Sequence, residues 1–110
     1  MKRPPPDLLP GTLDMIVLRV LASGRRHGYG IAQRVREISD DVLQVGESSL
    51  YPALQRLLLD DYVRAEWGPS ENNRRARFYT LTPAGRKHLG AERAEFDRLI
   101  GAIQRVLQDA

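Results

Sequence analysis

The chain has 110 residues, of which 42% are hydrophobic and 28% are charged, so its length allows one globular domain with a modest core. It contains no cysteine, which excludes disulfides, thiolate nucleophiles and cysteine-ligated metals and agrees with a reducing compartment. The net charge is +3, and the stretches 25–36 and 74–87 hold several arginines and no acid, a pattern that indicates either a polyanionic partner or a solvated surface.

The chain opens with MKRPPPDLLP, and its prolines predict an extended or flexible arm over residues 1–7. This stretch is basic but lacks the apolar segment of a secretory signal, and no later apolar run approaches membrane-spanning length. We therefore expect a cytoplasmic protein with no membrane partner.

A first helix is predicted over about residues 12–22, with Thr12 as its N-cap and Asp14 favourably placed in its first turn. Apolar side chains occupy nearly every side of this helix. They form two stripes, one with Leu13, Val17, Val20 and Leu21 and the other with Met15, Leu18 and Ala22. Because a domain of this size can cover only one stripe, we expect the second to contact another chain.

The next two predicted elements are a turn at SGRRHGYG and a second helix whose apolar residues run from Ile31 to Ile38. A third helix follows the SDD segment, with apolar residues at i, i+4, i+7 and i+8 from Leu50 to Leu58. We expect Ser48 or Ser49 to cap this helix. That places Pro52 in or beside the first turn, where a missing N–H costs little.

The start of the third helix carries groups that suit nucleic acid. Free backbone N–H groups, the two serine hydroxyls and the phenol of Tyr51 can bind phosphate oxygens or base edges. A helix start exposed in this way, after a short helix, is typical of a helix-turn-helix that enters the major groove. A plainer interpretation stays open, in which the serines are ordinary caps, Tyr51 is a core aromatic, and Gln55 and Arg56 face solvent.

A β-hairpin is predicted next, with the strands VRAEW and RFYTLT on either side of the polar loop GPSENNRRA. Arg74, Arg75 and Arg77 would make this hairpin a basic wing beside the third helix.

A last helix is predicted to begin with Thr82 as N-cap and Pro83 as the first helical residue, and to run to about Leu107. Its apolar residues follow a heptad-like seam formed by Leu89, Phe96, Ile100, Ile103 and Leu107.

The predicted fold class is mainly α with a small β-hairpin, arranged as a winged helix-turn-helix and a long C-terminal dimerisation helix. The expected organisation is an arm over 1–7, a DNA-binding domain over 8–81 and the dimerisation helix over 82–110. The last helix has little of its own chain left to pack against, so we expect a homodimer.

Three segments, LLPGTLDMIVLRVLASGRRHGYGIAQRV, SSLYPALQRL and RRARFYTLTPAGRKHL, resemble the PadR family of bacterial transcriptional regulators. The resemblance covers roughly residues 8–107, and the length is similar to that of the short subgroup with one C-terminal helix. It implies a winged helix-turn-helix, a dimer made through the first and last helices, and repression that a small molecule relieves.

The resemblance also implies roles for single residues. Tyr51 would contact a phosphate, Tyr29 would lie near the DNA backbone, and the expected partner is double-stranded DNA with a palindromic operator. The predicted DNA-binding set is Tyr29, Ser48, Ser49, Tyr51, Pro52, Gln55, Arg56, Arg74, Arg75 and Arg77. Two positions depart from the family pattern: Glu47 places an acid near the expected phosphates, and Asp61 stands where a glycine is common in a left-handed turn.

The predicted dimer interface comprises Leu13, Met15, Leu18, Leu89, Phe96, Ile100, Ile103 and Leu107. Gly90 and Gly101 interrupt the last helix, although an interior glycine costs about 1 kcal/mol relative to alanine. They allow either a close helix crossing or an apolar space lined by Met15, Leu18, Phe96 and Ile100. Because the resemblance implies flat aromatic ligands at this interface, we expect a neutral or cationic aromatic effector there.

We expect no catalytic residues, no metal and no cofactor. The only histidines, His27 and His88, are far apart in the sequence and read as a turn residue and a helix-surface residue, and there is no glycine-rich phosphate loop. The competing hypothesis is a dimeric winged-helix module that binds a protein partner and not DNA. That hypothesis predicts an exposed apolar patch at the start of the third helix.

Overall fold

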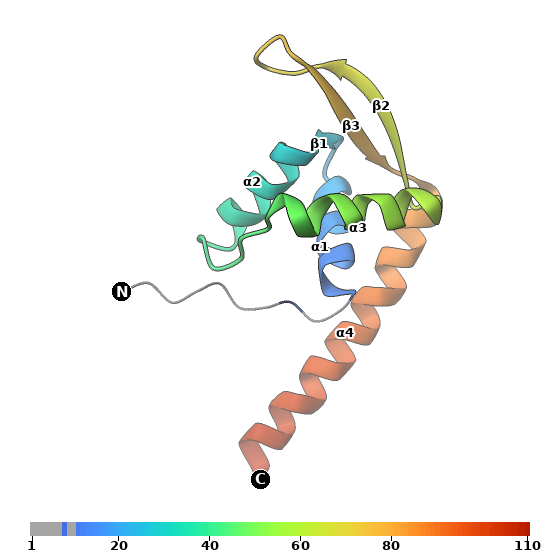
Figure 1. Ribbon diagram of the computed structural model, residues 1–110. Coiled ribbons are helices and arrows are strands. Elements are labelled where there is room, and N and C mark those ends of the chain that lie inside the picture. The colour runs from blue at the N-terminus through green and yellow to red at the C-terminus, as the bar shows by residue number, and fades with distance from the viewer. Residues whose placement is uncertain (1–7, 9–10) are drawn as a thin grey trace.

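The computed structural model describes residue 8 and residues 11–110, so the predicted arm over 1–7 lies outside the described residues. The elements are α1 (Thr12–Leu21), β1 (Arg26–His27), α2 (Gly28–Ile38), α3 (Glu47–Leu59), β2 (Val63–Pro69), β3 (Arg75–Leu81) and α4 (Pro83–Asp109). Helices α1 to α3 form the body, the β2–β3 hairpin projects from it, and the C-terminal half of α4 extends away (Figure 1). The predicted combination of a mainly helical chain, a small antiparallel sheet and a long last helix is confirmed.

Helix α1 lies at the centre of the core, in contact with α2, α3, α4 and β3. Val17 and Leu18 are both 0% exposed, although the sequence places them on different stripes of α1. The apolar residues of all four helices and of the sheet meet around them, at Val20, Leu21, Ile31, Val35, Leu50, Leu54, Leu57, Val63, Tyr79 and Leu89. A single chain therefore covers most of both α1 stripes, and the prediction that Leu18 needs a second chain is wrong.

The cap predicted for α1 is also corrected. Thr12 is the first helical residue, and the N-cap is Gly11, which makes no side-chain hydrogen bond and has φ 84°. Glycine adopts this left-handed backbone conformation more readily than other residues do. The start of α1 is therefore set by the backbone of Gly11 and not by a threonine hydroxyl.

The segment predicted only as a turn contains a short strand. Arg26 and His27 form β1 and pair with Tyr79 and Phe78 of β3, which makes a three-stranded sheet in the order β1-β3-β2. A strand of this length has no periodicity of its own, and its partner lies far along the sequence. The third strand therefore could not be inferred from local pattern.

Helix α4 is joined firmly to the turn between α3 and β2. The hydroxyl of Thr82 accepts from the backbone N–H of Gly85 at 2.9 Å and donates to the carbonyl oxygen of Asp61 at 2.7 Å. Asp61 has the left-handed conformation expected of it, with φ 61°. The predicted start of α4, with Thr82 as the cap and Pro83 as the first helical residue, is confirmed.

Two glycines of α4 should respond to alanine in opposite directions. A Cβ atom at Gly85 would overlap the carbonyl oxygen of Tyr62 and the side chain of Leu81, whereas a Cβ at Gly90 meets nothing within 4 Å. We expect Gly85→Ala to lower the free energy of unfolding by about 3 kcal/mol or more, since the backbone must move. Gly90→Ala should raise it by about 0.5–1 kcal/mol, because alanine favours the helix.

Chemical denaturation of both variants checks this pair. Equal destabilisation would mean that α4 does not pack against Tyr62 as the structure shows, because the two substitutions differ only in what the new methyl group meets.

Candidate nucleic-acid interface

The start of α2 is built by the segment HGY. The imidazole Nδ1 of His27 accepts from the backbone N–H of Gly30 at 3.0 Å and so caps the helix. Gly28 is buried, and a Cβ there would lie 3.1 Å from the hydroxyl of Tyr51, so the glycine makes room for that phenol. Tyr29 then faces outward and is 72% exposed. His27, predicted as a simple turn residue, is therefore a helix cap.

The start of α3 is open to solvent and has no side-chain cap. Its N-cap is Gly46, and Glu47 is the first helical residue, so the prediction that Ser48 or Ser49 caps the helix is wrong. Both serines lie in the exposed first turn. Backbone N–H groups at this end therefore have no side-chain partner from the cap position, and they carry the positive end of the helix dipole.

Pro52 lies deeper in α3 than predicted, because the helix begins at Glu47. It belongs to the second turn, where a non-proline residue would donate to the carbonyl of Ser48. Pro52 and Gln55 are exposed on the outer side of α3, while Leu50, Leu54 and Leu57 face the core. The helix is therefore anchored by its apolar face and presents a polar face.

Residues 63–81, which we call the wing, contain β2, β3 and their loop. In the antiparallel register Trp67 is opposite Arg77, and Pro69 is opposite Arg75, so these four side chains share one face of the hairpin. The guanidinium of Arg75 lies 5.6 Å from the ring centroid of Trp67, within cation–π range. Trp67 is 59% exposed, so the wing presents an aromatic ring among arginines.

Arg77 and Tyr79 make a second pair on this face, closer to the body. The Arg77 guanidinium lies 5.8 Å from the Tyr79 ring centroid. Burial raises the pKa of the Tyr79 hydroxyl above its ordinary value, although the neighbouring Arg77 opposes this shift. The phenol of Tyr79 therefore stays neutral at physiological pH.

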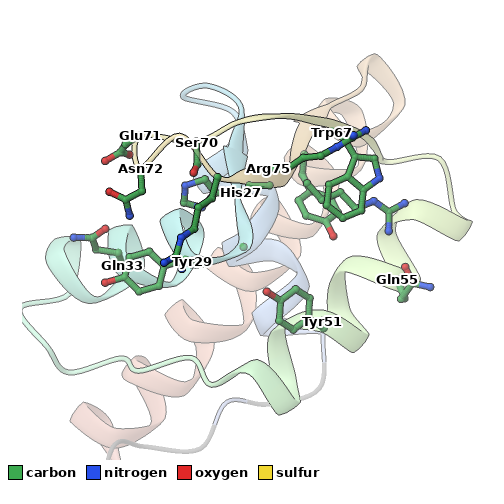
Figure 2. A pocket seen from close by; sticks show the side chains of 15 residues that line it. His27, Tyr29, Gln33, Tyr51, Gln55, Trp67, Ser70, Glu71, Asn72 and Arg75 are labelled. Atoms are coloured by element: carbon green, nitrogen blue, oxygen red, sulfur yellow. The ribbon is translucent and has the colours of Figure 1, made fainter.

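A groove of about 730 Å³ separates the wing from the starts of α2 and α3. Figure 2 shows side chains of the wing, among them Trp67, Arg75 and Asn72, facing Tyr29, Tyr51 and Gln55 of the helices. The predicted residues that line this groove are Tyr29, Tyr51, Gln55, Arg74, Arg75 and Arg77. Ser48, Ser49 and Pro52 lie outside it on the exposed part of α3. Tyr51 is 46% exposed, so its interpretation as a core aromatic is wrong.

Sequence analysis missed several residues that line the groove, namely His27, Gln33, Trp67, Ser70, Glu71 and Asn72. A signal for Trp67 was present, because it follows Val63 and Ala65 at every second position of β2 and so shares their face. Val63 is buried and Ala65 half-buried, whereas Trp67 lies beyond the edge of the core. The others depend on how the wing bends over α2, which no local pattern encodes.

Arg56 does not line the groove. Its guanidinium donates to both carboxylate oxygens of Asp14 in α1, at 2.7 and 3.3 Å, and this hydrogen bonding raises the pKa of Arg56. The contact joins residues 42 positions apart. Arg56 therefore ties α3 to α1, which weakens its prediction as a DNA-binding residue.

The two acid-free arginine stretches differ once the chain is folded. Arg25, Arg34 and Arg36 each form an ion pair, with Glu66, Glu37 and Asp41 respectively. Among residues 11–110, Arg74, Arg75 and Arg77 form none with a carboxylate. The wing therefore lines the groove with three arginines that have no carboxylate partner, and Glu71 is the acid that lines the same groove.

Comparison with known proteins agrees with this geometry. Residues 17–91 match the family model described as the transcriptional regulator PadR-like family, which is more than half of the chain. The chain belongs to the PadR-like family of transcriptional regulators. The predicted resemblance is therefore confirmed.

Two solved structures are similar to this PadR-like chain over most of their length. A transcriptional regulator from Clostridium thermocellum is 29% identical, with a TM-score of 0.79 and coverage of 86% of this chain and 92% of that one. A PadR-like transcription factor from Bacteroides fragilis is also 29% identical, with a TM-score of 0.71 and coverage of 87% and 90%.

Two relatives were found by sequence. A Lysinibacillus sphaericus protein is 30% identical over 83 residues, which is 76% of each chain. A 37.1 kDa protein from a transposon of Streptomyces fradiae is 40% identical over 90 residues, and the match spans only 24% of that larger protein.

Regulators of the PadR-like family are non-enzymatic transcription factors, so the prediction that the chain is not an enzyme is confirmed. The family is one of DNA-binding regulators with a winged-helix fold, and this decides against the alternative of a module that binds only protein. Across the part of the chain that the structure describes, none of the helices combines the length and hydropathy needed to cross a lipid bilayer.

The residues predicted for the dimer interface divide into two groups. Leu18 and Leu89 are buried in the core of their own chain, and Leu13 and Met15 pack partly against it. Further along α4, Phe96 and Ile100 are half-buried and Ile103 is exposed, while Leu107 is 77% exposed. Leu99 and Val106, which the predicted seam omitted, are exposed as well. The most exposed of these apolar side chains are therefore on the last three turns of α4, while those of α1 are at least partly buried.

Proposed function

We propose that this PadR-like regulator is a homodimeric repressor that binds a palindromic operator in the cytoplasm, with one α3 in each half-site. One observation carries the proposal: Tyr51 and Gln55 of α3 line the same groove as the unpaired arginines of the wing. A duplex placed against α3 would bring its phosphates to Arg74, Arg75 and Arg77, which suit phosphate oxygens. Glu47 lies beside this site and opposes the attraction.

Dimerisation through α4 is supported by the apolar side chains of its last turns. Burying a leucine or isoleucine gains about 1.5–3 kcal/mol, and Leu99, Ile103, Val106 and Leu107 are between 44% and 77% exposed in a single chain. A two-fold axis through this helix pair would present two α3 helices to DNA, and a symmetric protein matches a palindromic site.

We also propose that a small flat aromatic effector binds between α1 and α4. A groove of about 470 Å³ is lined there by Met15, Phe96 and Leu99. The expected lining changes in two respects, because Leu18 and Ile100 do not line this groove and four charged residues do, namely Glu92, Glu95, Arg98 and Arg105. Two acids and two arginines favour no single ligand charge. We therefore keep the expectation of an aromatic ligand but no longer specify that it is neutral or cationic.

The effector proposal is tested by a screen of aromatic compounds for release of bound DNA. Compounds that release DNA from the native chain should fail with Phe96→Ala, because the ring on which they stack is gone. Equal release from the variant would remove Phe96 from the effector site. An effector shifts the equilibrium only by its differential affinity for the two states.

Selection of duplexes from a random pool tests the DNA-binding proposal as a whole. The expected product is a sequence with two inverted half-sites about one helical turn, or a multiple of it, apart. Gln55→Ala should relax the preference at one position of each half-site while leaving overall affinity similar, because the side chain is placed to reach a base. Enrichment of a single half-site, or of no sequence, would contradict the dimeric arrangement.

A further inference from the structure

Trp67 is the only tryptophan of the chain, and the structure leaves it largely uncovered. It lies on the face of β2 that turns toward α3, beyond the point where Val63 and Ala65 fill the core. A single exposed apolar side chain needs no explanation by itself. This one differs because it lines the groove that holds the free arginines of the wing.

The surroundings of Trp67 alternate between charge and apolar surface. Arg77 is its direct cross-strand neighbour on the same face, and the Arg75 guanidinium lies 5.6 Å from its ring centroid. The backbone of a DNA strand has the complementary alternation, with an anionic phosphate on each side of a largely apolar deoxyribose. An indole between two guanidinium groups therefore matches one phosphate–sugar–phosphate unit.

The acid in the groove restricts where that strand can run. Glu71 lies in the loop of the wing, and Figure 2 shows it at the opposite end of the groove from Trp67. A phosphate next to this carboxylate would be repelled, whereas a phosphate beside Arg75 or Arg77 is attracted. The charges favour a path along the Trp67 end, across from Gln55.

We propose that Trp67 packs its indole against a deoxyribose of the DNA strand whose phosphates Arg75 and Arg77 bind. This inference rests on the proposed DNA-binding function and adds a contact of a different kind. A contact with the sugar does not distinguish one base from another, and it neutralises no phosphate, so it releases no counterion. It should therefore strengthen binding to every duplex equally without changing the dependence of affinity on salt.

The single tryptophan makes the contact directly measurable. With a mixed-sequence duplex at low salt as the probe, binding is followed by anisotropy of labelled DNA, and Trp67 emission is followed in the same titration. We expect acrylamide quenching of Trp67 to fall severalfold when the duplex saturates the protein, because the ring is covered. A duplex that binds while the quenching stays unchanged would overturn the proposal.

Substitution gives a second, independent readout. Trp67→Ala should weaken binding about tenfold for all duplexes, which is within the range measured for loss of one aromatic contact to nucleic acid. Trp67→Phe should retain most of the affinity, and Leu59→Ala serves as the control for loss of an exposed apolar side chain away from the groove. The slope of log K against log[salt] should be the same in the native chain and in all three variants.

A fall in that slope for Trp67→Ala would overturn the proposal, because it would mean that the ring only supports Arg75. Loss of affinity in Leu59→Ala equal to that in Trp67→Ala would do the same. These outcomes are distinct from failure of the proposed function, in which no duplex binds the native chain at all.

Discussion

Replacing Arg74 and Arg75 together by alanine is expected to weaken binding to every duplex and to flatten its dependence on salt. Each phosphate contact contributes about 0.9 to the slope of log K against log[salt], so the pair should remove about 1.8 for each protomer bound. At 0.1 M salt this corresponds to a loss of roughly 60-fold in affinity per protomer. Anisotropy titrations of one labelled duplex at several salt concentrations measure both quantities.

Two single substitutions control for the loss of charge. Arg64 is exposed on the same hairpin and points to its opposite face, opposite Thr80 in the register, and Arg56 is held by Asp14. Arg64→Ala and Arg56→Ala should each leave the slope nearly unchanged. Equal flattening by Arg64→Ala would show that net charge, and not the geometry of the wing, sets the affinity.

Placing aspartate at both Ile103 and Leu107 is expected to separate the dimer into monomers. The two side chains are exposed in a single chain, so the substitutions need not disturb the fold, but in the proposed interface they would bury charges without partners. Removing the partner of a buried charge costs several kcal/mol, enough to abolish a micromolar association. Sedimentation should then report a single species of 12.5 kDa, and binding to a two-half-site duplex should fall to the level of one half-site.

The matched control adds the same charges to α4 outside its apolar seam. Gln104 and Gln108 are exposed and lie off the apolar seam in the helical repeat. Gln104→Asp with Gln108→Asp should leave the dimer intact. Dissociation by both pairs would show that added negative charge on α4, and not disruption of the apolar seam, separates the protomers. Dissociation by neither would place the dimer interface outside the last turns of α4.

Local pattern was sufficient to predict most elements of this fold. The spacing of Leu50, Leu54 and Leu57 identifies the buried face of α3, and Thr82 with Pro83 marks the start of α4. Both signals concern residues a few positions apart, where side-chain spacing and backbone hydrogen bonding decide the outcome. Helix caps were predicted less well. The N-caps of α1 and α3 are Gly11 and Gly46, which have no side chain that could form the capping hydrogen bond expected from the sequence.

The arrangement of the candidate site could be predicted only in part. Its arginines and tyrosines were visible in the sequence, but the ion pair of Arg56 with Asp14 joins residues 42 positions apart, so no local pattern could show that this arginine is engaged by its own chain. The same holds for Leu18, which looked available on a helical wheel and is fully buried once α1 is surrounded by other elements. Trp67 was overlooked because its position relative to the edge of the core depends on how far the hairpin projects.

The affinity of the native protein for an operator duplex and for a scrambled duplex, measured over a range of salt, decides whether the chain reads DNA through α3 and the wing. We expect a linear fall of log K with log[salt] for both duplexes, with a slope of about −3.6 or steeper for a dimer that uses Arg74 and Arg75 in each protomer. The operator should bind more tightly at every salt concentration, because base contacts add to the phosphate contacts. A slope near zero, or equal affinity for the two duplexes, would contradict a regulator that reads DNA through α3 and the wing.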